Sequence, residues 1–331
     1  MRWFLLLAVL GLSVAQEASF AQRPPGAECP GSTRSASDEY RDTGYFAATG
    51  VVRFQLIQGR LQLDAPRHRK GSQNREAGDV YESITVTAAR GIPSLHYVFQ
   101  SPHHQLTLSV QHATHVRIES ILPKTGERAV LDQPRNGPIT FQIHQGDLNR
   151  SCSGTTLLHV RLDDPASFDL HCGRLIQQLL RGRSLKQLND EISVAVLKQI
   201  SKHEPTVVEE VRECVQKLRS PKLATRRKAE KQLLSWGVTI LPIIDAINPD
   251  DLDAEQVDRL RHIRTKFRSR EDDTARSLAM LLINDRDHWS RLAPRLNTDQ
   301  LQLANHHLDR VGLKTIPVTG DPVERIARNP E

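Results

Sequence analysis

Hydrophobic and polar residues alternate along the chain from about residue 45 onward. The stretch VVRFQLIQGRLQL sets Val52 and Phe54 two residues apart, and YESITVTA does the same with Ile84 and Val86. The alternation continues in LHYVF, QLTLSV, HVRIESIL, ITFQIH and TLLHVRL, which are separated by Gly, Pro or Asn-Gly breaks. Because successive side chains of a strand point to opposite faces, this period predicts an antiparallel β domain of about seven strands over residues 45–164. A sandwich, a barrel and an open sheet remain alternatives.

After Pro165 the apolar residues recur three and four positions apart. This spacing places them on one side of an α-helix, where they can pack against a core. We therefore expect connecting helices over residues 165–205 and a helical domain over residues 206–312. The fold class is α+β, with an all-β module followed by an all-α module. The first three predicted buried helical faces consist of Leu175, Ile176, Leu179 and Leu180; of Leu185, Leu188, Ile192, Val196 and Ile200; and of Val207, Val208, Val211, Cys214, Val215 and Leu218.

Helix boundaries are readable around the stretch SPKLATRRKAEKQLLSWGVTILPIIDAI. Ser220 followed by Pro221 predicts a helix start, since a hydroxyl can cap the first turn and proline suits the first helical position. Gly237 predicts a left-handed C-cap, and Thr239 is expected to cap the following helix. A further amphipathic helix is expected over Ala254–Phe267.

The two helices on either side of Gly237 are expected to share one hydrophobic core. Their large apolar side chains should be buried against one another and against the helix before them. The residues concerned are Leu233, Trp236, Ile240 and Ile244, together with Val211 and Leu218.

The stretch LRSPKLATRRKAEKQLLSWGVTILPIIDAI, continued by DLDAEQVDRLRHIRTKF, resembles the HEAT-like helical repeat common in exported proteins of planctomycete-type bacteria. The resemblance covers Leu218–Phe267, a small part of the chain. The family usually places an acidic residue after the arginine that corresponds to Arg226, whereas this chain has Arg227. The resemblance implies helix pairs packed side by side and, usually, no catalytic residues. It implies no specific partner.

The N-terminus has the pattern of a secretory signal peptide. Arg2 precedes the apolar run WFLLLAVLGL, which is too short to span a bilayer, and small residues follow it. We expect residues 1–21 to be a signal peptide cleaved near Gln16 or Gln22, residues 22–44 a disordered linker, and residues 313–331 a flexible tail. The predicted location is periplasmic or extracellular, with no transmembrane segment in the mature chain.

The chain of 331 residues carries a formal net charge of +6, which mildly favours anionic partners. Arginines spaced three and four apart predict a positive strip on and just after the expected helix Ala254–Phe267, provided that few acidic residues lie beside it. The solvated face of an ordinary helix is the alternative interpretation. The candidate binding residues are Arg226, Lys231, Arg261, Arg264 and Arg268.

Partners of this strip would be proteins or an anionic cell-envelope surface. Such contacts are expected to be weak and to fade as salt rises. Specific nucleic-acid binding is not expected, because that function calls for base-stacking aromatic residues and Trp236 is already assigned to the core.

Four cysteines in an exported protein raise the question of disulfide bonds. Cys152 and Cys172 flank one predicted strand and are the only plausible pair within the domain. Cys29 lies in the predicted linker, and Cys214 lies on the apolar stripe of a helix, where packing is its expected role.

Histidine is the one enriched residue type in and beside the predicted β domain. If QLTLSV and HVRIES form a hairpin, His112 and His115 lie at its turn, and His103 and His104 lie at the opposite end. The two pairs would then be roughly 20 Å apart, too far to hold one ion. These four are weak metal candidates, and exposed imidazoles are the expected interpretation. The other histidines of this region are His96, His144, His159 and His171.

No catalytic motif is recognisable, and neither catalytic residues nor a cofactor are predicted. We expect an exported, non-enzymatic binding or scaffold protein that acts through protein or cell-envelope contacts. The alternative is a β module that binds metal or envelope polysaccharide and is presented by a helical scaffold. An enzyme with an unrecognised site is the third hypothesis, and it requires convergent titratable groups that only a structure can reveal.

Overall fold

The computed structural model describes residues 53–64, 70–202, 206–269 and 271–317. All of them belong to a single compact unit within Ala36–Glu331. The predicted signal peptide (1–21), the predicted linker (22–44) and residues 318–331 of the predicted tail lie outside the described residues. None of the helices described is both long and apolar enough to cross a bilayer.

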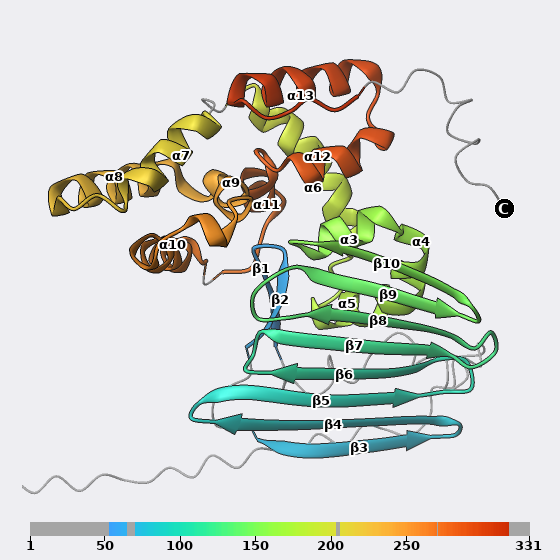
Figure 1. Cartoon of the computed structure of the whole chain (residues 1–331). Helices are drawn as coiled ribbons and strands as arrows, with labels where there is room; N and C mark the ends of the chain where they lie inside the picture. The colour runs from blue at the N-terminus through green and yellow to red at the C-terminus, as the bar shows by residue number, and fades with distance from the viewer. Residues whose placement is uncertain (1–52, 65–69, 203–205, 270, 318–331) are drawn as a thin grey trace, which may run out of the picture. The chain divides into compact units, whose positions relative to one another are not determined.

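The β region is an open antiparallel sheet in which eight strands follow one another in chain order, from β3 at one edge to β10 at the other (Figure 1). A barrel would require these two edge strands to pair, and they do not. A separate hairpin of two strands, β1 and β2, precedes the sheet. The strands are β1 (Phe54–Ile57), β2 (Arg60–Leu63), β3 (Gly71–Ala77), β4 (Val80–Ala89), β5 (Ile92–Gln100), β6 (Gln105–Gln111), β7 (His115–Leu122), β8 (Glu127–Gln133), β9 (Ile139–Gln145) and β10 (Leu148–Gly154).

The helical region follows directly and completes the predicted α+β class. Its first helices pack on the inner face of the sheet, and α5 lies behind the strands in Figure 1. A π-helical turn at Asp169–Gly173 joins α4 to α5. The helices are α3 (Leu157–Asp163), α4 (Pro165–Phe168), α5 (Arg174–Leu179), α6 (Leu185–Ile200), α7 (Val208–Lys217), α8 (Leu223–Trp236), α9 (Leu241–Asp245), α10 (Ala254–Phe267), α11 (Ala275–Leu282), α12 (Arg286–Leu292) and α13 (Thr298–Val311).

The segment TLLHVRL was predicted to be a strand and is instead helix α3. Thr156 caps this helix and accepts a hydrogen bond from the backbone N–H of His159. Leu157, Leu158 and Val160 are all buried, and apolar residues at these positions fit a helix enclosed on several sides. The β region therefore ends at Gly154, earlier than the predicted boundary at residue 164.

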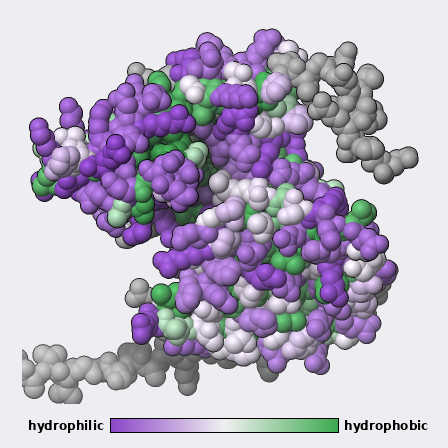
Figure 2. All heavy atoms as spheres, viewed as in Figure 1, coloured by the Kyte–Doolittle hydropathy of each residue, from purple (hydrophilic) through white to green (hydrophobic). Residues whose placement is uncertain are grey.

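The two faces of the sheet differ in chemistry. The inner face carries the main hydrophobic core, which includes residues of α3, α5 and α11 as well as the strands. The outer face is polar, and hydrophilic or intermediate residues cover most of the sheet in Figure 2. The inner-face core residues include Ile84, Val86, Tyr97, Leu108, Ile118, Leu131 and Phe141.

The predicted helical core is largely confirmed. Leu233, Ile240 and Ile244 are buried in one cluster with Val211 and Leu218. Trp236 packs against the same cluster but stays half-buried. Its indole therefore lies at the edge of this core and not inside it.

Some predicted helix ends are confirmed and others are wrong. Helix α10 has the predicted bounds. Gly237 ends α8 with a positive φ of 71°, but its ψ of −156° lies outside the left-handed α region that was predicted for this cap. Helix α8, however, begins at Leu223 and not at Pro221, and the carbonyl groups of Ser220 and Pro221 accept hydrogen bonds from Arg226. The Thr239 hydroxyl donates to the carbonyl of Trp236 and does not cap α9.

The β1–β2 hairpin connects the sheet to the helical region. The side chain of Gln133 on β8 accepts from the backbone N–H of Leu61 at 2.9 Å and donates to its carbonyl at 2.8 Å. On the helical side, Asp272 Oδ1 accepts from the N–H of Leu56 at 2.8 Å, and Asp273 Oδ2 accepts from that of Gly59 at 2.7 Å. Sheet and helices are thus joined by hydrogen bonds as well as by a shared core.

Candidate functional site

Two buried polar clusters lie where the chain passes from the sheet to the helices. Segment 157–173, which contains α3, α4 and the π-helical turn, contributes one histidine to each. The Ser120 cluster consists of His104, Ser120, Glu127 and His171. The His159 cluster consists of Thr155, Thr156, His159, Asp285 and His288.

The Ser120 cluster brings together residues from four separate elements. Ser120 lies on the inner face of β7, and Glu127 is the first residue of β8. His171 lies in the π-helical turn, which packs against β7. His104 precedes β6 in a short turn in which Ser101 Oγ accepts from its backbone N–H at 3.0 Å. Single-turn π-helices are rare and occur frequently at functional sites.

Hydrogen bonds in this cluster form a continuous chain. Ser120 Oγ lies 2.8 Å from His171 Nδ1 and 2.8 Å from His104 Nε2. His171 Nε2 lies 3.1 Å from Glu127 Oε1. A carboxylate can only accept, so His171 donates from Nε2 and its Nδ1 is the acceptor for the Ser120 O–H. The remaining lone pairs of Ser120 Oγ then accept from His104 Nε2–H.

The side chains joined by these hydrogen bonds differ in their exposure to solvent. His104 is half-buried, whereas Ser120 and His171 are each only 1% exposed. Burial, together with the smaller effects of His171 and Arg174, lowers the pKa of His104 to about 4. His104 is therefore neutral at pH 7, which fits its role as a neutral donor to Ser120.

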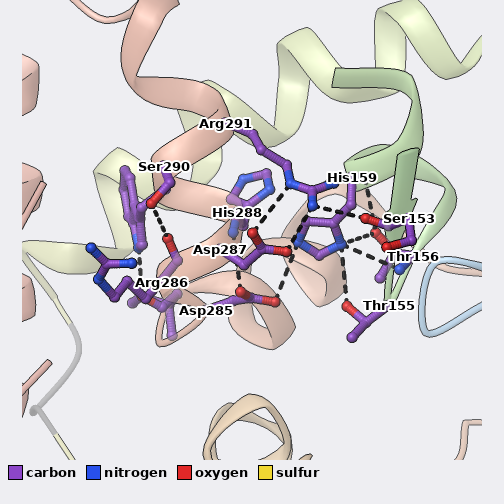
Figure 3. A network of polar contacts seen from close by, with 12 residues as sticks. Ser153, Thr155, Thr156, His159, Asp285, Arg286, Asp287, His288, Ser290 and Arg291 are labelled. Atoms are coloured by element: carbon purple, nitrogen blue, oxygen red, sulfur yellow. Dashed lines mark hydrogen bonds and ion pairs between the residues drawn. The ribbon is translucent and has the colours of Figure 1, made fainter. Parts of the chain in front are cut away.

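The His159 cluster joins α3 to α12 (Figure 3). His159 is fully buried, and its Nδ1 accepts from the backbone N–H of Thr156 at 3.2 Å. The hydroxyl oxygens of Thr155 and Thr156 lie 3.2 Å and 2.9 Å from the same nitrogen. These contacts leave the proton on His159 Nε2, which lies 3.3 Å from Asp285 Oδ2. That separation is within ion-pair range but is not aligned as a hydrogen bond.

His288 is the unusual member of the cluster. It is 1% exposed, and neither of its ring nitrogens has a hydrogen-bond partner. Burial and the nearby His159 lower its pKa to about 3, although Asp285 opposes the shift. The pKa of Asp285 is itself lowered, because contacts with His159 outweigh the opposing effect of burial. His288 is thus a neutral imidazole whose polar atoms are unsatisfied in the core.

Arg291 lies beside the His159 cluster and contacts residues of β10, α3 and α12. Its Nη1 lies 2.9 Å from Asp163 Oδ2 at the end of α3, and its Nη2 donates to the carbonyl of Ser153 on β10 at 2.8 Å (Figure 3). A second carboxylate, Asp287, lies 3.1 Å from Nη2. One guanidinium therefore connects the edge strand, α3 and α12.

The predicted basic residues do not form a strip with few acidic neighbours, which was the condition of that prediction. Their role in binding stays a prediction. Lys231 is exposed on α8. The contacts of the other four are Arg226 Nε–Glu255 Oε1 at 3.2 Å, Arg261 Nη1–Asp258 Oδ1 at 3.2 Å, Arg264 Nη2–Asp245 Oδ1 at 2.8 Å and Arg268 Nη2–Gln62 Oε1 at 2.9 Å.

The histidine hairpin is confirmed: β6 and β7 pair, with His112 and His115 at the turn and His103 and His104 beyond the opposite end. Within the described residues, no group of three or more His, Cys, Asp or Glu side chains is arranged to hold a metal ion. His104 belongs to the Ser120 cluster, and His115 Nε2 lies 3.1 Å from Asp132 Oδ1.

The disulfide considered between Cys152 and Cys172 is absent from the structure, where both are free thiols. The Cys152 thiol contacts the carbonyl oxygens of Phe141 and Val160 at 3.7 and 3.8 Å. Cys172 is buried in the main hydrophobic core, and burial raises its pKa to about 12. Each thiol therefore has its own packing environment.

Sequence reasoning singled out neither cluster. The enrichment in histidine was the one signal, and it included His104, His159 and His171 without grouping them. Their partners lie on elements that are distant in the sequence, so no local spacing indicates them.

Comparisons with protein-family models, with curated protein sequences and with solved structures find no match for this chain.

Proposed function

We propose that this chain is an exported, non-enzymatic binding or scaffold protein that contacts proteins or the cell envelope. The leader-like residues 1–21 support export. The HEAT-like resemblance of Leu218–Phe267 supports a scaffold of packed helices.

One observation carries the binding proposal: the outer face of the sheet is broad and nearly neutral. The described residues of this face include two arginines. Arg117 lies 2.7 Å from Glu119 and 3.9 Å from Asp132, so its charge is paired locally. Arg128 is exposed opposite His144. Most other positions carry hydroxyl, amide or imidazole groups. Residues that alternate with the buried ones include Thr85, Thr87, His96, Gln100, Thr107, Ser109, Thr140, Gln142, His144, Asn149 and Ser151.

This chemistry favours a neutral, hydroxyl-rich partner over a strongly anionic one. Uncharged donors and acceptors spread over a flat surface match the hydroxyl groups of a polysaccharide. Contacts of this kind depend little on ionic strength, whereas contacts made by exposed arginines weaken with salt. The envelope polysaccharide alternative and the basic-strip prediction therefore make different predictions in one assay.

The test measures retention of the unmodified protein and of three variants on isolated envelope fragments across a salt series. The first variant removes outer-face groups from β5, β6 and β9, and the second changes the arginines to Ser. Two exposed glutamines on helices α8 and α13 serve as the matched control. The substitutions are H96A/T107A/Q142A, R261S/R264S/R268S and Q232A/Q302A.

We expect only the outer-face variant to lose retention, and binding to change little with salt. Loss confined to the arginine variant, together with steep salt dependence, would move the contact to the basic residues. Equal retention of the unmodified protein and all three variants, or no retention of the unmodified protein, would contradict an outer-face envelope contact.

A further inference from the structure

A serine hydroxyl lies between two imidazoles in the core, and one of these imidazoles is hydrogen-bonded to a carboxylate. The distances are 2.8 Å from Ser120 Oγ to His171 Nδ1 and 3.1 Å from His171 Nε2 to Glu127 Oε1. A hydroxyl, a base and an acid that orients the base, each within hydrogen-bond reach of the next, are the arrangement that activates a serine.

We propose that Ser120 is a nucleophile for activated acyl esters, with His171 as its base, Glu127 orienting that base and His104 covering the hydroxyl. The proposal departs from the non-enzymatic role proposed above, because it adds an acyl-transfer reaction at atoms that the binding role does not use. The imidazole contacts Ser120 through Nδ1 and Glu127 through Nε2, the reverse of the serine protease arrangement. Since either ring nitrogen can act as the base when the other is protonated, this reversal does not alter the proton transfer.

The chemical step uses only groups already in place and the ester itself. Ser120 Oγ attacks the ester carbonyl carbon, and its proton passes to His171 Nδ1. Glu127 stabilises the resulting imidazolium through Nε2–H. When the carbon–oxygen bond of the ester breaks, the leaving alcohol takes the proton from Nδ1, and Ser120 remains acylated. Water can then hydrolyse the acyl group by the same steps with His171 again as base.

His104 explains why the hydroxyl is covered. It is the outermost member of the cluster, and its Nε2 lies 2.8 Å from Ser120 Oγ on the side not used by His171. Burial keeps the His104 imidazole neutral, because it lowers the pKa to about 4. Removing this ring therefore opens the free lone pairs of Ser120 without disturbing the bond to His171. Arg174, which is exposed and acts electrostatically on His104, places a positive charge near this ring.

A purely structural cluster makes a different prediction. If the cluster only stabilises the packing of β7, β8 and the π-helical turn, Ser120 would react with no electrophile in the folded protein. As a covered nucleophile, Ser120 would react slowly in the unmodified protein and faster once the cover is removed.

The experiment measures covalent labelling by a fluorophosphonate probe. An activated serine attacks the phosphorus of this probe and displaces fluoride. The full chain is compared with H104A, S120A and H104A/E127Q, and the labelled residue is identified by peptide mass spectrometry. Thermal melting of each protein at the same pH establishes that it is folded.

We expect labelling at Ser120 that is about tenfold faster in H104A than in the unmodified protein, and none in S120A. The E127Q change should slow labelling of H104A by about a hundredfold, because the base loses its orienting carboxylate. A folded H104A protein without label at Ser120 would overturn the proposal, as would equal rates with and without E127Q.

If H104A does not fold, the unmodified protein, S120A and E127Q decide the question at a temperature just below the onset of melting. Ser120 should then be labelled in the unmodified protein and not in the folded E127Q protein within the same time. Absence of label from Ser120 in the unmodified protein under these conditions would overturn the proposal.

Discussion

The imidazole rings of His159 and His288 meet edge to face, with their centroids 5.6 Å apart, where α3 packs against α12. His159 contacts Asp285, whereas His288 has no hydrogen-bond partner at either ring nitrogen. Protonation of His288 would place a buried positive charge beside His159 and near Arg291, and Asp285 would oppose the cost of that charge. Acid is therefore expected to weaken the packing of α3 against α12.

We expect the protein to lose stability as the pH falls below about 6.5. The unfolded chain then binds a proton on His288, and the folded chain does not until about pH 3. A histidine with these two pKa values lowers the free energy of unfolding by about 2 kcal/mol at pH 5 relative to pH 8. His104, with a pKa lowered to about 4, acts in the same direction. Urea unfolding of the unmodified protein and of H288L at pH 7, 5 and 4 should show a flatter pH dependence for H288L, and parallel curves would refute this.

Asp273 acts in the opposite direction. It accepts from the N–H of Gly59 and from Ser277, but burial dominates and raises its pKa to about 6. The folded state keeps this proton to a higher pH than the unfolded state, so the stabilisation is complete below about pH 3.8 and is lost as the pH rises through 6. The shift corresponds to a loss of about 3 kcal/mol over that window. The unfolding free energy of D273N should lack this fall, and an identical fall in both proteins would exclude Asp273 as its source.

Leu233 is fully buried in the core of α7–α10. Replacing it with Ala should lower the free energy of unfolding by about 2–5 kcal/mol, because a cavity remains where the side chain was. Leu223, on the same helix, is 47% exposed and provides the control. Its replacement by Ala should cost less than about 1 kcal/mol. Calorimetric melting curves measure both effects, and an unchanged curve for L233A would show that this face is not the core.

Gly154 ends β10 directly against His159. A Cβ at this position would collide with the Cβ of His159, which the buried helix α3 holds in place. The G154A change should therefore cost about 1–3 kcal/mol through overpacking. At Gly71 a Cβ would meet nothing within 4 Å, so G71A is the matched control. Equal stability of G154A and G71A would mean that α3 can move away from the sheet edge.

Export can be tested on protein recovered from its native cells. We expect the mature chain to begin near Gln16 or Gln22, because a signal peptidase cleaves after small residues that follow the apolar run. N-terminal sequencing of the cell fractions measures this directly. An intact Met1 on a cytosolic product would refute export.

Residue order alone determined the features that depend on local periodicity. Alternation at Ile84 and Val86 indicated strand faces that the structure confirms, and the spacing from Ala254 to Phe267 indicated α10 with its observed bounds. These features follow because the period of two or 3.6 residues is a property of the backbone, which neighbouring residues already express.

Tertiary structure decided everything that depends on which segments meet. The open sheet and the pairing of Arg226 with Glu255 and of Arg264 with Asp245 required contacts between elements that are separate in the sequence. The two clusters are the clearest case, because Ser120 and His171, or His159 and Asp285, become partners only when distant elements pack together. A sequence expresses its local period directly, whereas the partner of a buried polar group is set by packing between elements, and no local period encodes that choice.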